Sequence, residues 1–489
     1  MMAYGIFVHE PWLDEAHSWL LARDTSMIDL LTTYLRYEGH PPLWYAIINV
    51  LTTLNLPYVM LNVTAAVIVA IGVVLLYRLD GVPLMVKVLL PFTYFIAYQY
   101  GIVARSYVLI FPLLLAIIHQ YPRRSERIWT FTALLLLLCN VSVHALMIAA
   151  ALTLLYIIDV WRGRQVIVQG ALRRQLTALG VLILNGIALV AILWPPRDLA
   201  IKPILDYDFS PGKMYGITRL ALTANLFNEP LLAFICLGVI CTWLWRRGAL
   251  LELLIVLGFL IPITTVYFNL WHEGLFVLVL FFGVLLGYAR PARVADADSA
   301  RDRRLTLGVT TIFCLVLIQH VIWTVLALSY DREAPYSGSR AAAQFIETYG
   351  LQNHRLYGAG FAVIGVQPYF EKNIFANYHP KGGYSFLDWT TSSDLYIPRR
   401  PAMKKWMDSR MRESPDFFLV SQKFSSEVIY SRALAADSRY RRIAVFPGRL
   451  FWKTRARERE YFMLYGRIDA LKFLTASPEW AGTSQTSSQ

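Results

Sequence analysis

Residues 57–78 read PYVMLNVTAAVIVAIGVVLLYR, an apolar run with no charged side chain before its final arginine. A helix needs about 20 apolar residues to cross the hydrocarbon core of a bilayer. Lipid offers no hydrogen-bond partners to an open backbone, so such a run must be helical. Similar runs follow along the chain and predict a mainly α protein with about 10–11 membrane spans. Ten of these are placed at 57–78, 84–103, 106–120, 128–143, 145–161, 176–194, 229–245, 249–269, 272–288 and 305–329.

Composition agrees with a membrane protein. Hydrophobic residues make up 56% of the 489 positions and charged residues 16%, below the roughly 25% of soluble domains. The net charge of +13 comes from basic residues in the short connections, which the positive-inside rule places in the cytoplasm. Nucleic-acid binding is therefore a poor interpretation of this charge. The basic residues concerned are Arg78, Lys87, Arg123, Arg124, Arg127, Arg162, Arg164, Arg173, Arg174, Arg246, Arg247 and those from Arg290 to Arg304.

Alternation from these connections fixes the expected topology. It places a first loop, 9–56, a long loop, 195–228, the turn at 269–273 and everything after 330 outside the cytoplasm. A crossing at 43–55 would invert every later loop, so we expect an interfacial helix there. Residues 1–8 are too short to span, and we expect the first helix of this domain, 1–329, to be shortened or missing from the gene model.

The tail differs in composition from the rest. A helix-like stretch, SRAAAQFIETYG at 339–350, precedes the strand-like runs DFFLVSQ, RRIAVF and EYFMLYG. This alternation predicts a small extracytoplasmic α/β domain over 330–475. Residues 476–489 have the composition of a disordered tail.

The first polar cluster is HEPWLDEAH at 9–17, where Asp14 and Glu15 open a helix-like run. One interpretation is structural: Asp14 caps this helix and Glu15 favours the positive end of its dipole. The other is functional, because a helix start at a membrane surface presents a carboxylate to a ligand. The residues alone leave both open.

The second cluster is YEGHPPLWY at 37–45. Gly39 permits a turn and the two prolines stiffen the chain, so that Glu38 and His40 project from a rigid bend. These side chains either face water or hold a cation or a phosphate. The pair alone is weak evidence for a metal.

The remaining polar positions also fall at the outer ends of predicted spans. Charged groups at such depth are costly and usually line a site, although an arginine also snorkels to headgroups. The long loop is either a functional lid or a passive surface loop. The candidates are Arg105, Tyr107, His144 and His272 at the span ends, with Lys202 in the long loop.

Taken together, Asp14-Glu15 in the first outer loop, E-G-H-P-P-L-W-Y at 38–45 and A-R-S-Y at 104–107 resemble the C-type glycosyltransferase (GT-C) superfamily. The nearest branch is that of the bacterial protein O-mannosyltransferase-like and lipid A aminoarabinose transferase-like enzymes. The resemblance implies a multi-pass plasma-membrane enzyme that transfers a sugar, with inversion, from a polyprenyl-phosphate carrier. The acceptor would be an extracytoplasmic hydroxyl of a glycan, lipid or protein.

The same resemblance implies roles for individual residues. Asp14, with Glu15 beside it, would be the catalytic base or acceptor-binding carboxylate, and Arg105 would hold the carrier phosphate. Glu38 and His272, or His144, would hold a divalent cation, while no nucleotide or redox cofactor is expected. The donor-binding candidates are then Glu38, His40, Arg105, Tyr107, His144, His272 and Lys202.

Two other classes of protein remain as alternatives. A secondary transporter would favour inverted repeats and helices broken at the midplane, whereas the polar interruptions here lie at outer ends. A non-catalytic membrane scaffold whose tail binds glycans or proteins is disfavoured by the acidic motifs.

Overall fold

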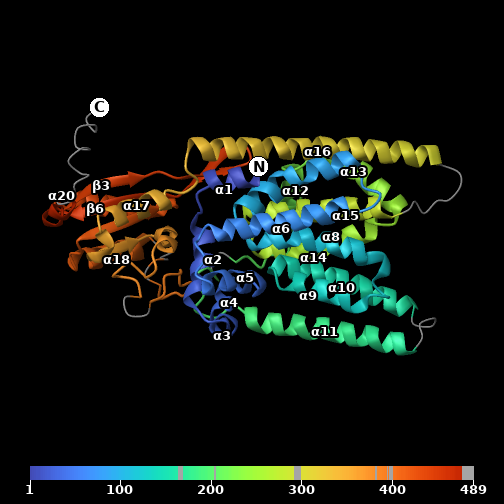
Figure 1. Cartoon of the computed structure of the whole chain (residues 1–489), viewed down its shortest axis with the longest axis horizontal. Helices are drawn as coiled ribbons and strands as arrows, with labels where there is room; N and C mark the ends of the chain where they lie inside the picture. The colour runs from blue at the N-terminus through green and yellow to red at the C-terminus, as the bar shows by residue number, and fades with distance from the viewer. Residues whose placement is uncertain are drawn as a thin grey trace.

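The computed structural model describes residues 1–163, 169–202, 205–290, 299–379, 383–393, 395 and 400–475. A bundle of helices and a smaller α/β domain lie end to end along the long axis (Figure 1). Within the described residues, six helices are long and apolar enough to cross a membrane. They are α6 (Met60–Tyr77), α10 (Val143–Gly163), α11 (Gln169–Leu193), α13 (Pro230–Arg247), α15 (Glu273–Ala289) with the turn before it, and α16 (Ser299–Glu333).

The other predicted spans are shorter or broken. The expectation of one continuous helix over 84–103 is wrong. Pro91, which has no N–H to continue a helix, lies in a 3-10 turn, and Thr93 is extended at φ −66° and ψ 150°. The segments of these shorter spans are α7 (Leu84–Leu89), η2 (Leu90–Phe92), the π-helix η3 (Tyr94–Ile102), η4 (Ser106–Leu109), α8 (Ile110–Gln120), α9 (Ile128–Cys139) and α14 (Leu250–Val266).

Burial differs sharply between the helices. In α15 and its preceding turn, 94% of the most apolar window is buried, whereas the value for α11 is 22%. α15 is therefore the central helix, and α11 lies at the edge of the bundle (Figure 1). Large apolar side chains on α11 are exposed, as expected for a surface that meets lipid: Leu176, Ile183, Leu184, Ile187 and Val190.

The two ends of the bundle carry different residues. At the end away from the α/β domain, called here the basic end, arginines pair with acidic side chains: Arg124 with Asp159, Arg247 with Asp302 and Arg290 with Glu252. The basic residues that determined the predicted topology thus gather at one end of the bundle, although Arg164 and 291–298 lie outside the described residues.

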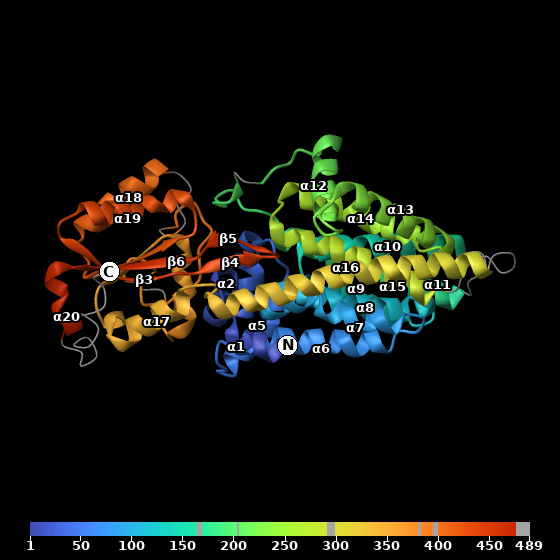
Figure 2. The same ribbon diagram turned by 90° about the horizontal axis from the view of Figure 1, so that it is seen from above.

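The tail forms the predicted α/β domain. Its main sheet has the order β1-β2-β6-β3, with β1 parallel to β2 and the other pairs antiparallel. α17 covers one face, and α18 with α19 covers the other (Figure 2). The elements are α17 (Ser339–Thr348), β1 (Leu356–Ala359), η9 (Phe361–Tyr369), α18 (Arg400–Arg412), β2 (Phe417–Gln422), α19 (Val428–Ala436), β3 (Tyr440–Phe446), β6 (Tyr461–Arg467) and α20 (Lys472–Thr475), with a hairpin of β4 (Arg449–Trp452) and β5 (Arg455–Arg459). The expected disorder of 476–489 lies outside the described residues.

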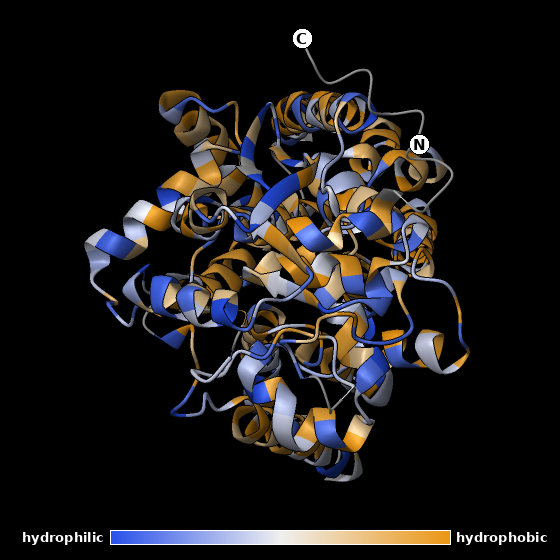
Figure 3. Ribbon diagram, turned by 90° about the vertical axis from the view of Figure 1, so that its left-hand side faces the viewer, coloured by the Kyte–Doolittle hydropathy of each residue, from blue (hydrophilic) through white to orange (hydrophobic). Residues whose placement is uncertain are grey.

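The N-terminal segment lies at the junction of the two parts. α2 (Leu13–Asp24) packs on α5 (Leu43–Thr53) and on η9 of the α/β domain. At about 1.5 Å per residue, α5 and α1 (Met2–Val8) are both too short to cross a bilayer. Seen from the α/β-domain end, blue hydrophilic segments lie in front of the orange helices (Figure 3). We call this end of the bundle, where it meets the N-terminal segment and the α/β domain, the cavity end, after the cavity described below.

Candidate functional site

A cavity of about 390 Å³ lies at the cavity end, between the bundle, the N-terminal segment and the α/β domain. Two of the nine residues predicted from the sequence, Glu15 and Lys202, do not line it, and Lys202 is exposed. The other seven predicted residues line the cavity, although Asp14 and His272 are 258 residues apart in the sequence. The predicted residues that line the cavity are Asp14, Glu38, His40, Arg105, Tyr107, His144 and His272.

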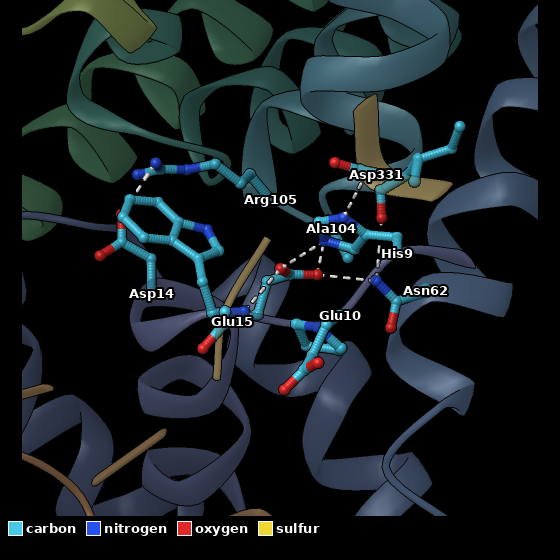
Figure 4. A network of polar contacts seen from close by, with 12 residues as sticks. His9, Glu10, Asp14, Glu15, Asn62, Ala104, Arg105 and Asp331 are labelled. Carbon is cyan, nitrogen blue, oxygen red and sulfur yellow. Dashed lines mark hydrogen bonds and ion pairs between the residues drawn. The ribbon is translucent and has the colours of Figure 1, made fainter. Parts of the chain in front are cut away.

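Asp14 forms an ion pair with Arg105, at 2.8 Å between Oδ2 and Nη1. The Asp14 side chain is 35% exposed, and the guanidinium lies near the Tyr107 ring, 5.5 Å from its centroid. Asp14 is not the helix cap, because Trp12 occupies that position. The capping interpretation is thus wrong, and the Asp14 carboxylate points toward Arg105 and the cavity (Figure 4).

Glu15 is buried away from the cavity. Its carboxylate accepts hydrogen bonds from the N–H groups of Trp12 (3.2 Å) and Ala104 (3.0 Å) and from Asn62 Nδ2 (2.7 Å). The His9 ring lies at 3.1 Å from Oε2 (Figure 4). These contacts leave Glu15 no route to a substrate, so its predicted catalytic role is replaced below by a structural one.

The carboxylate of Glu38 is oriented by His17, which was not among the site residues predicted from the sequence. The N–H of Leu387 donates to His17 Nδ1 at 3.2 Å, so the ring proton is on Nε2, which donates to Glu38 at 2.8 Å. Glu38 ends α4 (Leu35–Glu38), and Gly39 then takes φ +63°, a conformation that glycine adopts without strain. The bend predicted at 38–42 is confirmed in this respect.

Three histidines surround the Tyr107 ring. Its centroid lies 6.0–6.4 Å from the ring centroids of His40, His144 and His272, and the last two rings are 4.4 Å apart. Both nitrogens of His144 and Nδ1 of His40 are buried without a hydrogen-bond partner. Burial, with the charge of Arg105, lowers the pKa of His40 to about 4, so this ring is neutral at pH 7. Neutral imidazoles of this kind can donate to or accept from a ligand.

The metal assignment remains a prediction. Among the residues that the structure describes, no group of three or more His, Cys, Asp or Glu is arranged to hold an ion. Glu38 instead bonds to His17 and, at 3.4 Å, to the Tyr45 hydroxyl. Titration with a chelator would test whether a cation is needed.

Two cationic side chains that were not predicted from the sequence also line the cavity. Arg36 and Lys423 line it together with Arg105, and Arg36 Nε is buried without a partner. Lys423 Nζ lies 4.0 Å from the Trp12 ring centroid. The position of Arg36, two residues before Glu38, was a usable signal, whereas nothing local marks Lys423.

Two further walls complete the cavity. The α/β domain contributes Phe361, Leu387, Trp389 and Phe424 beside Lys423. The long loop binds to this domain, since the N–H of Ala200 donates to the carbonyl of Trp389 at 2.8 Å. The opposite wall is apolar and is formed where α11 and α14 end, by Leu193, Pro195, Ile263 and Val266.

Comparison with protein-family models, with curated proteins and with solved structures gives no match for this chain.

Proposed function

We propose that this protein is an inverting glycosyltransferase that moves a sugar from a polyprenyl-phosphate carrier to an extracytoplasmic hydroxyl. One observation carries the proposal: a single cavity combines a partly exposed carboxylate, several cations and an apolar wall. A hydroxyl nucleophile needs the carboxylate as a base, and a leaving phosphate needs the cations. A prenyl chain needs the apolar wall.

In the proposed reaction, Asp14 accepts the proton of the acceptor hydroxyl. The hydroxyl oxygen forms a bond to the anomeric carbon while the bond from that carbon to the phosphate oxygen breaks, through an oxocarbenium-like state. The polyprenyl phosphate leaves with the electron pair. Attack opposite the leaving group inverts the anomeric configuration.

The leaving phosphate is proposed to lie among the three cations. Arg105 presents a planar guanidinium, which suits a phosphate, and Arg36 Nε has no protein partner to give up. The prenyl chain would continue along the apolar wall at the ends of α11 and α14. The active site would then face the extracytoplasmic side, in keeping with the basic residues at the opposite end.

The test uses the purified full-length protein in lipid vesicles with a polyprenyl-phosphate-linked sugar and a candidate acceptor. We expect release of polyprenyl phosphate and a product of inverted anomeric configuration, detected by mass spectrometry and NMR. A donor pool that stays intact with every sugar and acceptor tried would contradict the proposal. Solute accumulation in sealed vesicles with no loss of donor would instead indicate a transporter.

A further inference from the structure

A buried chain of charged side chains lies directly behind the Asp14–Arg105 pair. His9 bridges two carboxylates, with Nε2 at 3.1 Å from Glu15 and Nδ1 at 3.1 Å from Asp331. The side chains of all three are at most 1% exposed. Asp331, which lies beside His9 in Figure 4, also accepts a hydrogen bond from the Tyr98 hydroxyl at 2.9 Å, which ties the last turns of α16 to the π-helix η3.

Glu15 connects the backbone on both sides of the ion pair. It follows Asp14 in α2, and its Oε2 accepts the N–H of Trp12 at the start of that helix. Its Oε1 accepts the N–H of Ala104, the residue before Arg105. One carboxylate therefore fixes the chain segment that carries the Asp14 side chain and the segment that carries the Arg105 side chain.

The chemistry of this network explains why it needs charge. Glu15 accepts four bonds from N–H groups, and a carboxylate can accept them all with its two oxygens. A glutamine has one oxygen and would turn an NH₂ group toward N–H donors. Burial lowers the pKa of His9, but Glu15 and Asp331 outweigh it and raise this pKa to about 10, so the ring is a cation that offsets part of their charge.

We propose that Glu15, His9 and Asp331 are positioning residues that hold the Asp14 carboxylate and the Arg105 guanidinium in register across the cavity. None of the three lines the cavity, so they act through the pair and not on the substrate. The kinetic consequence rests on the function proposed above, whereas the structural consequence does not.

The kinetic test compares Glu15→Gln and His9→Gln with the wild-type full chain in vesicles. A displacement of about 1 Å in a reacting group lowers turnover by up to about 100-fold. We expect kcat for donor turnover to fall by about 10-fold to 100-fold, with the donor KM changed by less than about threefold. The control is Glu252→Gln, which breaks the partly buried ion pair with Arg290 at the basic end and should leave kcat unchanged.

The structural test does not depend on turnover. In hydrogen–deuterium exchange, Glu15→Gln should speed exchange in peptides that cover 12–16 and 104–106, and Glu252→Gln should not. Unchanged exchange at 104–106 would overturn the proposal even if the protein proves not to be a transferase. A wild-type protein with no donor turnover but with the expected exchange would reject the function and keep the network.

A double substitution separates positioning from direct catalysis. If Glu15 acts only through the Asp14–Arg105 pair, then Glu15→Gln in an Arg105→Gln background, in which that pair is already broken, should cost less than about twofold further. If the activity losses of the two single substitutions multiply in the double variant, Glu15 has an independent role and the proposal is contradicted. Equal melting temperatures of the single and double variants ensure that folded protein is compared.

Discussion

The two ends of the helical bundle differ in how their partly buried charged side chains are paired. At the basic end, Arg290 pairs with Glu252 at 2.6 Å and Arg124 with Asp159 at 2.8 Å. At the cavity end, Arg105 pairs with Asp14, but Arg36 and Lys423 line the same space, and Glu38 bonds to His17. The ion pairs of the basic end do not line the cavity, whereas the Asp14–Arg105 pair lies beside its open volume.

This difference separates pairs that stabilise the fold from pairs that are available to a ligand. The ion pairs at the basic end do not line the cavity, so their loss should leave donor turnover unchanged. Among the residues that line the cavity, three cations face two carboxylates, and this excess of positive charge supports the proposal of an anionic ligand. Matched substitutions at the two ends can test this contrast.

The largest effect is expected for Asp14→Asn. Removal of a general base typically lowers turnover by about 100-fold to 10,000-fold, and we expect donor turnover to fall within this range. The matched variant is Asp159→Asn, which loses the partner of Arg124 at the basic end. Both are measured as release of polyprenyl phosphate per folded protein. Full activity of Asp14→Asn would rule out its assignment as the base.

Arg105→Lys should have the next largest effect. A lysine keeps the charge but loses the planar fork that matches a phosphate, so donor kcat/KM should fall about tenfold. Arg247→Lys changes an arginine that pairs with Asp302 at the basic end, and we expect a change of less than about twofold. Equal losses in the two variants would remove the distinction between the ends.

Arg36→Gln should act mainly on binding. Loss of one charge-assisted hydrogen bond to the donor phosphate should raise the donor KM by about threefold to tenfold with little change in kcat. Arg123, exposed at the basic end, provides the control Arg123→Gln. A fall in kcat at constant KM would indicate that Arg36 acts in the chemical step.

The smallest effect concerns pH and stability. Glu460 accepts the N–H of Leu13 at 3.1 Å and the Ser337 hydroxyl at 2.7 Å, and burial raises its pKa to about 7, despite opposing interactions with Lys423 and Ser337. The folded protein then binds this proton more tightly than the unfolded chain does, so stability falls as pH rises from about 4.5 to 7. The loss is at most about 3 kcal/mol.

Melting temperatures between pH 5 and pH 6.5 can measure this slope. His9 has its raised pKa near 10 and contributes a change only above about 6.5, outside that window. Glu460→Gln, whose side chain does not titrate, should make this slope shallower without abolishing it, because burial also raises the pKa of Glu10 and of Glu427. An equally steep slope in this variant would assign the pH dependence to another group.

Much of the architecture could be predicted from the sequence because it depends on composition. Runs such as 57–78 and 229–245 are helices, the tail is an α/β domain, and Asp14, Arg105 and His272 lie at one end of the bundle. These follow from apolar length, strand-like alternation and the parity of the crossings. Pro91 indicated a break in the helix predicted over 84–103, but the apolar residues around it favoured one continuous span.

The separation of Asp14 from Glu15 could not be predicted in this way. Neighbours on a helix point about 100° apart, so the side chains of Asp14 and Glu15 do not point in the same direction. Which one faces the cavity is decided by Asn62, Ala104 and His9, which contact Glu15 from distant or non-helical segments. Lys423 and Trp389 likewise reach the cavity only through the docking of the α/β domain.

The contact between Leu13 and Glu460 has a consequence for biosynthesis. The carboxylate of Glu460, which binds the first turn of the helix that carries Asp14, is synthesised 447 residues after Leu13. The cavity cannot be complete until the α/β domain, which supplies Lys423 and Trp389 to its lining, has been made and has docked on the bundle. A chain whose synthesis stops before the α/β domain would therefore lack the completed cavity.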